Sequence, residues 1–287
     1  MSVVYKKELK GYFNSMTGYV YVAFALAVIG VYTYAVCLRQ VFPNFEYVLD
    51  SVRFLFALLM PILTMRTMSE ERRQRTDQLL YSSPISTWSI VFGKFFAALT
   101  VYGLPLLVSC FYPVLLSRFG SVNFPTAYAG IFAFLLMGGA AIAIGIFLSS
   151  LTDNLMVAAV LSFGAMLICY IMPSLANMVS ASAMTSAMCF AVLAILAGYF
   201  IYETSRNLIL GGGIAAVVVG ALLAVFRFKR TLLEGTFNKA MNALSVFSRF
   251  DSFVYGVFDL KAVIYFLTII VLFVFFTVQT VEKRRWS

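Results

Sequence analysis

Long apolar segments with almost no charged residues constrain this chain more than any other feature. The 287 residues are 62% hydrophobic and only 11% charged, whereas soluble domains carry about 25% charged residues. Several runs exceed the ~20 apolar residues that a helix needs to cross a hydrocarbon core. These runs lack the alternation of barrel strands, and backbone groups in lipid must be satisfied within their own segment. The sequence therefore predicts an all-α fold, a polytopic transmembrane helix bundle.

The apolar runs predict about eight membrane spans within one transmembrane domain, residues 1–287. No soluble domain is evident between them. The predicted spans are Gly18–Leu38, Leu49–Met68, Ile90–Leu116, Thr126–Ser149, Leu155–Ile171, Ala181–Tyr202, Leu208–Phe226 and Ala262–Val281.

The distribution of lysine and arginine predicts a multi-pass protein of the cell membrane with both termini in the cytoplasm. Arg227, Lys229 and Arg230 are exceptions that fall on the outer side. The net charge of +9 is assigned to topology and to contact with anionic lipids, because no basic face with interleaved aromatics lies outside the spans. Nucleic acid is therefore not an expected partner. The positive residues on the cytoplasmic side are Lys6, Lys7, Lys10, Arg66, Arg72, Arg73, Arg75, Lys94, Arg206, Lys283, Arg284 and Arg285.

Residues 1–17 are short, basic and partly apolar. Lys6, Lys7 and Lys10 are interspersed with apolar and aromatic residues that include Tyr5 and Tyr12. On a helix these residues separate loosely into two sides, which is typical of an amphipathic helix lying on a membrane surface. The alternative is a frayed basic tail.

Residues 231–260 are too polar to span a membrane, but their apolar residues recur at steps of three and four. This spacing predicts an external amphipathic helix, with a plain connecting loop as the alternative. The recurring residues are Leu232, Leu233, Phe237, Met241, Leu244 and Phe247.

Small residues spaced by four predict close helix contacts within the membrane, either in one bundle or in a dimer. They are Gly139 and Ala143, Ala141 and Gly145, and the series Gly212, Ala216 and Gly220.

Several kinds of chemistry are missing from the sequence. There is no histidine, no GxxxxGK[ST] phosphate loop, no cluster of metal-ligand spacing and no catalytic constellation, so we expect no enzyme activity, no metal and no cofactor in this chain. An ion-coupled carrier needs a titratable group near the midplane, whereas Arg53 and Lys94 are expected near helix ends, where their side chains can reach the interface. The energy for any transport is therefore expected from a partner. An ATP-independent carrier and a non-transporting membrane component stay open.

The polar segment Arg66–Ser89 is the best candidate for a contact with a soluble partner. Ser69 is expected to cap a helix through Glu70–Tyr81, with Glu70 and Glu71 in its first turn and Pro84 after its end. A solvated loop that only sets the topology is the alternative.

Three blocks of the sequence resemble one family of membrane proteins. The segment PILTMRTMSEERRQRTDQLLYSSPISTWSIVFGKFFA (Pro61–Ala97) resembles the region between the second and third helices of type-2 ABC exporter permeases, and is closest to the gliding-motility-like branch. The opening YKKELKGYFNS and the C-terminal run FDSFVYGVFDLKAVIYFLTIIVLFVFFTVQTVEKRRW are also similar to that branch.

The resemblance implies a permease that pairs with a second copy or a paralogue. Two separate ATPase subunits, which carry ATP and Mg²⁺, would dock beneath the pair on a coupling helix in residues 66–89, and Tyr5–Tyr12 would form a connecting helix on the inner surface. Typical members have six spans and often a glycine where this chain has Arg75. The residues implied to line the ATPase contact are Glu70, Glu71, Arg72, Arg73, Arg75, Thr76, Asp77, Leu79 and Leu80.

Overall fold

The described part of the chain is helical throughout. The computed structural model describes residues 1–39, 44–76, 86–180, 182–192, 199, 220 and 234–286, and no strand occurs among them. These residues divide into two compact units. Unit 1 comprises Met1–Tyr170 and Val246–Ser287, and unit 2 comprises Ile171–Ser245.

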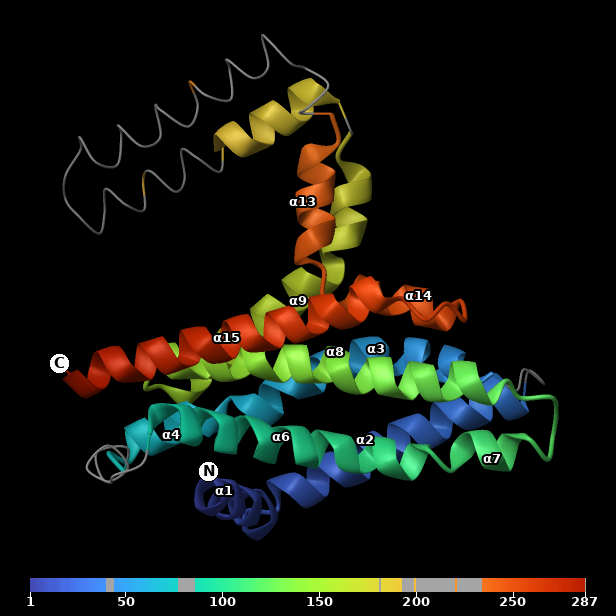
Figure 1. Ribbon diagram of the computed structural model, residues 1–287, viewed down its shortest axis with the longest axis horizontal. Helices are drawn as coiled ribbons and strands as arrows, with labels where there is room; N and C mark the ends of the chain where they lie inside the picture. The colour runs from blue at the N-terminus through green and yellow to red at the C-terminus, as the bar shows by residue number, and fades with distance from the viewer. Residues whose placement is uncertain are drawn as a thin grey trace. The chain divides into compact units, whose positions relative to one another are not determined.

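Helix α8 (Phe124–Leu151) is the centre of unit 1 (Figure 1). It packs against α15 (Leu260–Trp286), α3 (Phe45–Thr64) and α6 (Thr87–Ser109). In its most apolar stretch, 72% of the residues are buried, more than in any other described span. A helix that is apolar on all sides is expected inside a bundle, and α8 occupies that position.

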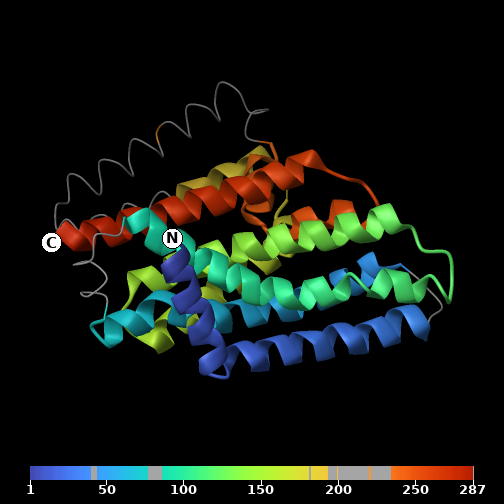
Figure 2. The same ribbon diagram turned by 60° about the horizontal axis from the view of Figure 1, so that its bottom comes forward.

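The remaining helices of unit 1 surround this core. Helix α2 (Thr17–Thr33) continues into a π-helical turn, η1 (Tyr34–Leu38), and packs on α3 and α6. Helix α1 (Ser2–Asn14) crosses the beginning of α6, as Figure 2 shows. The short helices α4 (Arg66–Arg73) and α7 (Tyr112–Leu116) follow α3 and α6, and α9 (Leu155–Met178) follows α8.

Six of the eight predicted spans are confirmed by helix length and composition. Ala181–Tyr202 is described only at residues 182–192, which include a shorter apolar helix, and at Tyr199. Leu208–Phe226 lies outside the described residues except for Gly220. The six confirmed spans are Thr17–Leu38, Phe45–Arg73, Thr87–Leu116, Phe124–Leu151, Leu155–Met178 and Leu260–Arg284.

The two parts of unit 1 meet at Tyr170, the last residue of the first part. The Tyr170 ring lies with its centroid 5.0 Å from that of Phe54 in α3. In the second part, the Phe247 ring lies 5.8 Å from that of Tyr170.

Within unit 2, helix α13 (Thr236–Leu244) is fastened to the end of α9. The Asn238 side chain donates hydrogen bonds to the carbonyl oxygens of Ala176, at 2.7 Å, and Val179, at 2.9 Å. The prediction of one continuous helix over residues 231–260 is wrong, because α13 ends at Leu244 and the backbone is extended at Ser245. The chain continues as a 3-10 turn, η2 (Phe247–Phe250), and a short helix, α14 (Asp251–Val254).

Arg53 holds this returning segment against α3. Its guanidinium is paired with Asp251 and lies 3.1 Å from Asp50, and it donates to the carbonyl of Phe247 at 3.0 Å. The expectation that Arg53 extends to the interface is therefore wrong: its side chain, only 16% exposed, is folded onto the protein. An arginine inside a bundle is stabilised when carboxylates pair with its guanidinium, so the guanidinium does not have to reach water.

Glycines on α8 set the closest approaches between helices. A Cβ at Gly145 would lie 2.8 Å from Thr64 Cβ in α3, and one at Gly138 would overlap the ring of buried Tyr102 in α6. Gly139 faces the end of the flexible Ile270 side chain at 3.3 Å, and Ala143 is buried. Gly220 has open space around it, while Gly212 and Ala216 lie outside the described residues.

We predict that Gly145→Ala destabilises the protein by about 1–3 kcal/mol, because the added methyl group forces α3 and α8 apart. The measurement is thermal unfolding in detergent. Gly164→Ala on α9 is the matched control, since nothing lies within 4 Å of a Cβ there, and alanine favours the helix at that position. Equal effects of the two substitutions would contradict the close packing at Gly145.

Candidate functional site

Helix α4 begins where α3 breaks at Met65, and a serine from α8 stabilises the break. The Ser149 hydroxyl accepts from the backbone N–H groups of Met68 and Ser69, both at 3.2 Å, and donates to the Met65 carbonyl at 2.9 Å. The predicted N-cap at Ser69 is wrong. Ser69 is buried within α4, and its own hydroxyl donates to the Met65 carbonyl. The groups left open at the break are thus satisfied by a residue distant in sequence.

Helix α4 ends in a Schellman motif, so the predicted helix through Tyr81 is wrong from Gln74 to Thr76. The Thr76 N–H donates to the Glu71 carbonyl at 2.9 Å, and the Arg75 N–H donates to the Arg72 carbonyl at 3.0 Å. Arg75 has φ 56°, in the left-handed region. This position of the motif favours glycine, which gives a physical reason for the glycine of the resembling permeases. Asp77, Leu79 and Leu80 lie outside the described residues.

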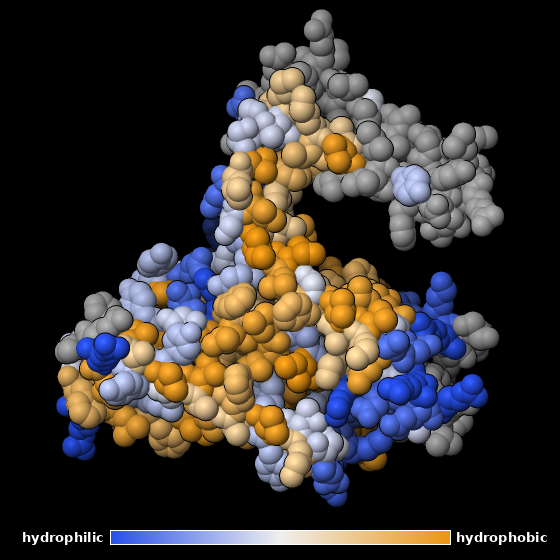
Figure 3. Space-filling view, turned by 180° about the vertical axis from the view of Figure 1, so that it is seen from behind, coloured by the Kyte–Doolittle hydropathy of each residue, from blue (hydrophilic) through white to orange (hydrophobic). Residues whose placement is uncertain are grey.

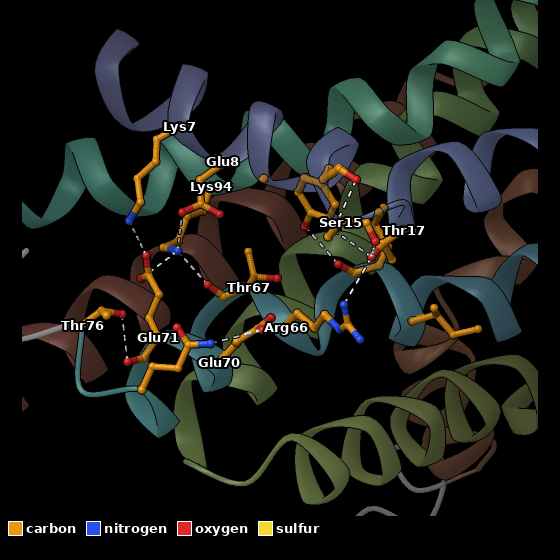
Figure 4. Close-up of a pocket in the computed structure, with 15 residues that line it drawn as sticks. Lys7, Glu8, Ser15, Thr17, Arg66, Thr67, Glu70, Glu71, Thr76 and Lys94 are labelled. Atoms are coloured by element: carbon orange, nitrogen blue, oxygen red, sulfur yellow. Dashed lines mark hydrogen bonds and ion pairs between the residues drawn. The ribbon is translucent and has the colours of Figure 1, made fainter.

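Lys94 of α6 lies at the centre of a buried ionic network (Figure 4). Its ammonium is 2.8 Å from a carboxylate oxygen of Glu8 in α1, 2.8 Å from one of Glu71 in α4, and 2.7 Å from the Thr67 carbonyl. The side chain is 1% exposed. The expectation that the Lys94 side chain extends to water is therefore wrong: its ammonium is enclosed by these partners, without which so deeply buried a cation is not tolerated.

Glu71 extends this network to the surface of α1. Its second carboxylate oxygen is 2.9 Å from Lys7 Nζ. Helices α1 and α6 also touch directly, because Gly93 lets α6 approach α1 until a Cβ would lie 2.9 Å from Val4 Cγ1. Together, Lys7, Glu8, Glu71 and Lys94 (the Lys94 network) join α1, α4 and α6.

A second network joins α4 to the ends of α8 and α15. The guanidinium of Arg72 donates to the Ser150 carbonyl and lies 3.6 Å from Asp153. Asp153 is also 2.9 Å from Arg284, which donates to the Leu151 carbonyl at 3.0 Å. The N-terminal helix and the end of α15 therefore lie at the same end of unit 1 as α4.

The aromatic residues of α1 face the bundle, and two of its lysines face away from it. The Tyr5 hydroxyl is 3.1 Å from that of Thr100, and the Tyr12 hydroxyl donates to the Leu63 carbonyl at 3.0 Å. Burial raises the pKa of Tyr12, and Glu8 adds to this effect, so the hydroxyl keeps the proton that it donates. Lys6 and Lys10 are exposed.

The charges on α4 and its C-terminal turn divide into two sets. Glu71 and Arg72 point inward, whereas Arg73 and Arg75 are exposed and Glu70 is partly exposed. In Figure 3, hydrophilic residues gather at the end of unit 1 that carries the termini, next to a broad hydrophobic surface. This end can offer Glu70, Arg73 and Arg75 to a soluble partner while Glu71 and Arg72 hold α4 in place.

A cavity of about 370 Å³ opens beside the Lys94 network. Residues from α1, from the start of α2 and from the α3–α4 break line it, including Ser15, Thr17, Ile62, Arg66 and Gln74. Among the described residues, no group of three or more histidine, cysteine, aspartate or glutamate side chains could hold a metal ion.

Sequence reasoning missed the residues that fix α1 and α4 from a distance. Glu8, Ser149 and Asp153 carry no local signal, because their partners lie more than fifty residues away. Lys94 did carry a local signal, because a single cation in an otherwise uncharged span is costly unless an anion pairs with it.

We predict that Lys94→Met releases α1 from the bundle. Removing the cation leaves the Glu8 carboxylate buried without its partner, a kind of loss that costs about 3–5 kcal/mol. The measurement is amide hydrogen exchange of residues 2–14, which should become faster. The double variant Glu8→Gln/Lys94→Met should recover part of the protection, because Glu71 keeps Lys7. Unchanged exchange in the single variant would contradict the network.

We predict that Arg75→Gly stabilises the end of α4 by about 1 kcal/mol, because glycine adopts the left-handed conformation without steric cost. Slower amide exchange at Thr76, whose N–H closes the motif, is the measurement. Arg73→Gly is the matched control within the helix, where glycine should cost about 1 kcal/mol. The same sign of effect at both positions would argue against the motif.

Comparison with known proteins identifies one family. A family model described as "ABC-2 family transporter protein" matches residues 4–281. No curated protein and no solved structure was found to match the chain. The match does not separate the branches of the family, so the gliding-motility-like branch stays a prediction. Because the matched residues cover nearly the whole chain, it belongs to the ABC-2 family of transporter proteins.

Proposed function

We propose that this permease component of an ABC transporter is an exporter subunit driven by a separate ATPase. The observation that carries the proposal is the division of charge at the end of unit 1: α4 is fixed from within by Glu71 and Arg72 and leaves Arg73 and Arg75 exposed. A short helix that is connected to four others and charged on its free side is suited to receive force from a soluble partner.

The energy for transport would come from the ATPase subunits, which would hold ATP and Mg²⁺. The absence of a GxxxxGK[ST] loop from the sequence supports the assignment of ATP binding to these separate subunits. The contact would comprise the exposed charges of α4 and its C-terminal turn. Asp77, Leu79 and Leu80, which follow this turn in the sequence, are proposed as further contacts on the resemblance alone.

The charged end of unit 1 would face the cytoplasm of a cell whose plasma or inner membrane holds the protein. The positive-inside rule supports this orientation, because the exposed residues Lys6, Lys10, Arg66 and Arg73 belong to the elements gathered there. With α1 and the end of α15 beside α4, both termini would be cytoplasmic, and α1 would lie at the level of the lipid headgroups.

A second permease copy or a paralogue would complete the transporter. Among the confirmed spans, Leu155–Met178 has the smallest buried share in its apolar window, 17%, and Thr17–Leu38 and Leu260–Arg284 each have 28%. These helices expose apolar side chains that lipid or a second permease can cover.

We predict that Arg73→Glu weakens binding of the ATPase by about tenfold or more, since reversing an exposed contact charge places like charges together. The full chain is co-purified in detergent with candidate ATPase subunits, and ATP hydrolysis is measured with and without it. Arg118→Glu is the matched control, because Arg118 is an exposed arginine that follows α7 on the far side of the span Thr87–Leu116.

Three results would contradict the proposal. Equal binding of the ATPase by the two variants would show that α4 is not part of the ATPase contact. A chain that purifies alone and leaves ATP hydrolysis unchanged would favour an ATP-independent carrier, whereas a stable complex without transport would favour a non-transporting membrane component.

A further inference from the structure

The cavity beside the Lys94 network contains one cation that is not engaged by a carboxylate among the described residues. Arg66 is exposed, and its guanidinium is 3.3 Å from the Thr17 hydroxyl. The acidic residues that line the cavity have other partners. Glu8 is paired with Lys94, Glu71 with Lys7 and Lys94, and the Glu70 carboxylate accepts from the Gln74 amide at 3.5 Å. Arg66 is thus the cation in this cavity best placed to bind an added anion.

Uncharged hydrogen-bond donors lie next to this guanidinium. The hydroxyls of Ser15 and Thr17 are 3.0 Å apart, and both residues line the cavity (Figure 4). Each donates a long hydrogen bond to a nearby carbonyl, Ser15 to Tyr12 at 3.4 Å and Thr17 to Ser15 at 3.3 Å, and can rotate toward a stronger acceptor. Helix α2 also starts at Thr17, after Met16 with φ 58°, and no side chain caps it. The first N–H groups of a helix carry a partial positive charge and have no intrahelical acceptor. A guanidinium, two hydroxyls and open backbone donors are the groups that bind phosphate.

The same cavity borders an apolar surface. Ile62 lines it and is 46% exposed. On the adjacent turn of α2, Tyr19 is 60% exposed and Val20 is 65% exposed. Thr17 begins one membrane span and Arg66 lies near the end of another, so the polar donors sit at the boundary of the hydrocarbon core. A free phosphate would use only the polar half of this surface, whereas a phospholipid would use both halves.

We propose that this cavity binds the phosphate headgroup of an anionic membrane lipid, with Arg66, Ser15, Thr17 and the first N–H groups of α2 as donors and Ile62 beside an acyl chain. The site does not require the ATPase or the direction of transport. It connects the α1–α2 turn to α4 through a ligand held by the membrane, so binding stabilises α4 in its position against α1.

The test uses the full chain in detergent. It is titrated with short-chain phosphatidylglycerol, short-chain phosphatidylcholine or inorganic phosphate, and bound molecules are counted by native mass spectrometry. The expected result is saturable binding of phosphatidylglycerol to the wild-type chain. Arg66→Gln should weaken that binding about tenfold, because a hydrogen bond to a charged group is worth at least ~1.5 kcal/mol. Glu70→Gln should strengthen it by removing a nearby negative charge.

Lys10→Gln is the matched control, since Lys10 is an exposed cation of α1 that does not line the cavity. Equal losses from Arg66→Gln and Lys10→Gln would overturn the proposal in favour of diffuse attraction to basic residues. Equal binding of inorganic phosphate and phosphatidylglycerol would overturn it in favour of a soluble anion. If Arg66→Gln does not fold, Thr17→Val serves instead, and it must weaken phosphatidylglycerol binding for the proposal to stand.

Discussion

The buried ammonium of Lys94 is the interaction on which the charged end of this protein depends. A lysine with a side chain only 1% exposed is strongly destabilising unless carboxylates surround it. Glu8 and Glu71 can reach it only if α1 lies across α6 and if α4 ends beside both helices. The requirement of one cation therefore adds to the packing of Val4 and Tyr12 in holding α1, and it ties the short, polar α4 to the same place.

The charged residues of α4 also differ in what they bind. Glu71 and Arg72 are neighbours in sequence, yet they serve separate networks on two sides of the helix, one toward α1 and α6 and the other toward α8 and α15. A helix of eight residues is too short to be stable alone. These two networks, together with the Ser149 hydroxyl, replace the apolar packing that it lacks. The remaining charges, on Glu70, Arg73 and Arg75, are at least partly exposed. A compact charged segment can therefore expose only part of its charge and bury the rest.

Composition alone predicted the helix bundle and six of its spans, because apolar length in lipid permits almost no other structure. The details at the charged end could not be obtained in this way. The cap of α4 comes from Ser149, the partner of Lys94 is Glu8, and Arg284 meets Asp153; each of these pairs joins residues that only the tertiary fold brings together. Local rules that placed a cap at Ser69 and a helix through Tyr81 failed because the α3–α4 break and the left-handed Arg75 override propensity.

The two networks also determine how a displacement of α4 can spread. Through Lys94, a push on α4 acts on α1 and α6, which flank the outer helix α2. Through Asp153, it acts on α8 and α15, the core of unit 1. The buried pairs of Lys94 with Glu8 and Glu71 resist stretching because separation in a medium of low dielectric is costly, whereas the exposed pair of Asp153 with Arg284 contributes less. The firmest connection of α4 is therefore with α1 and α6. The close contacts at Gly138 and Gly145 continue that rigid connection along α8, and a force applied at one end of the bundle is thereby delivered to its centre rather than lost in a flexible loop.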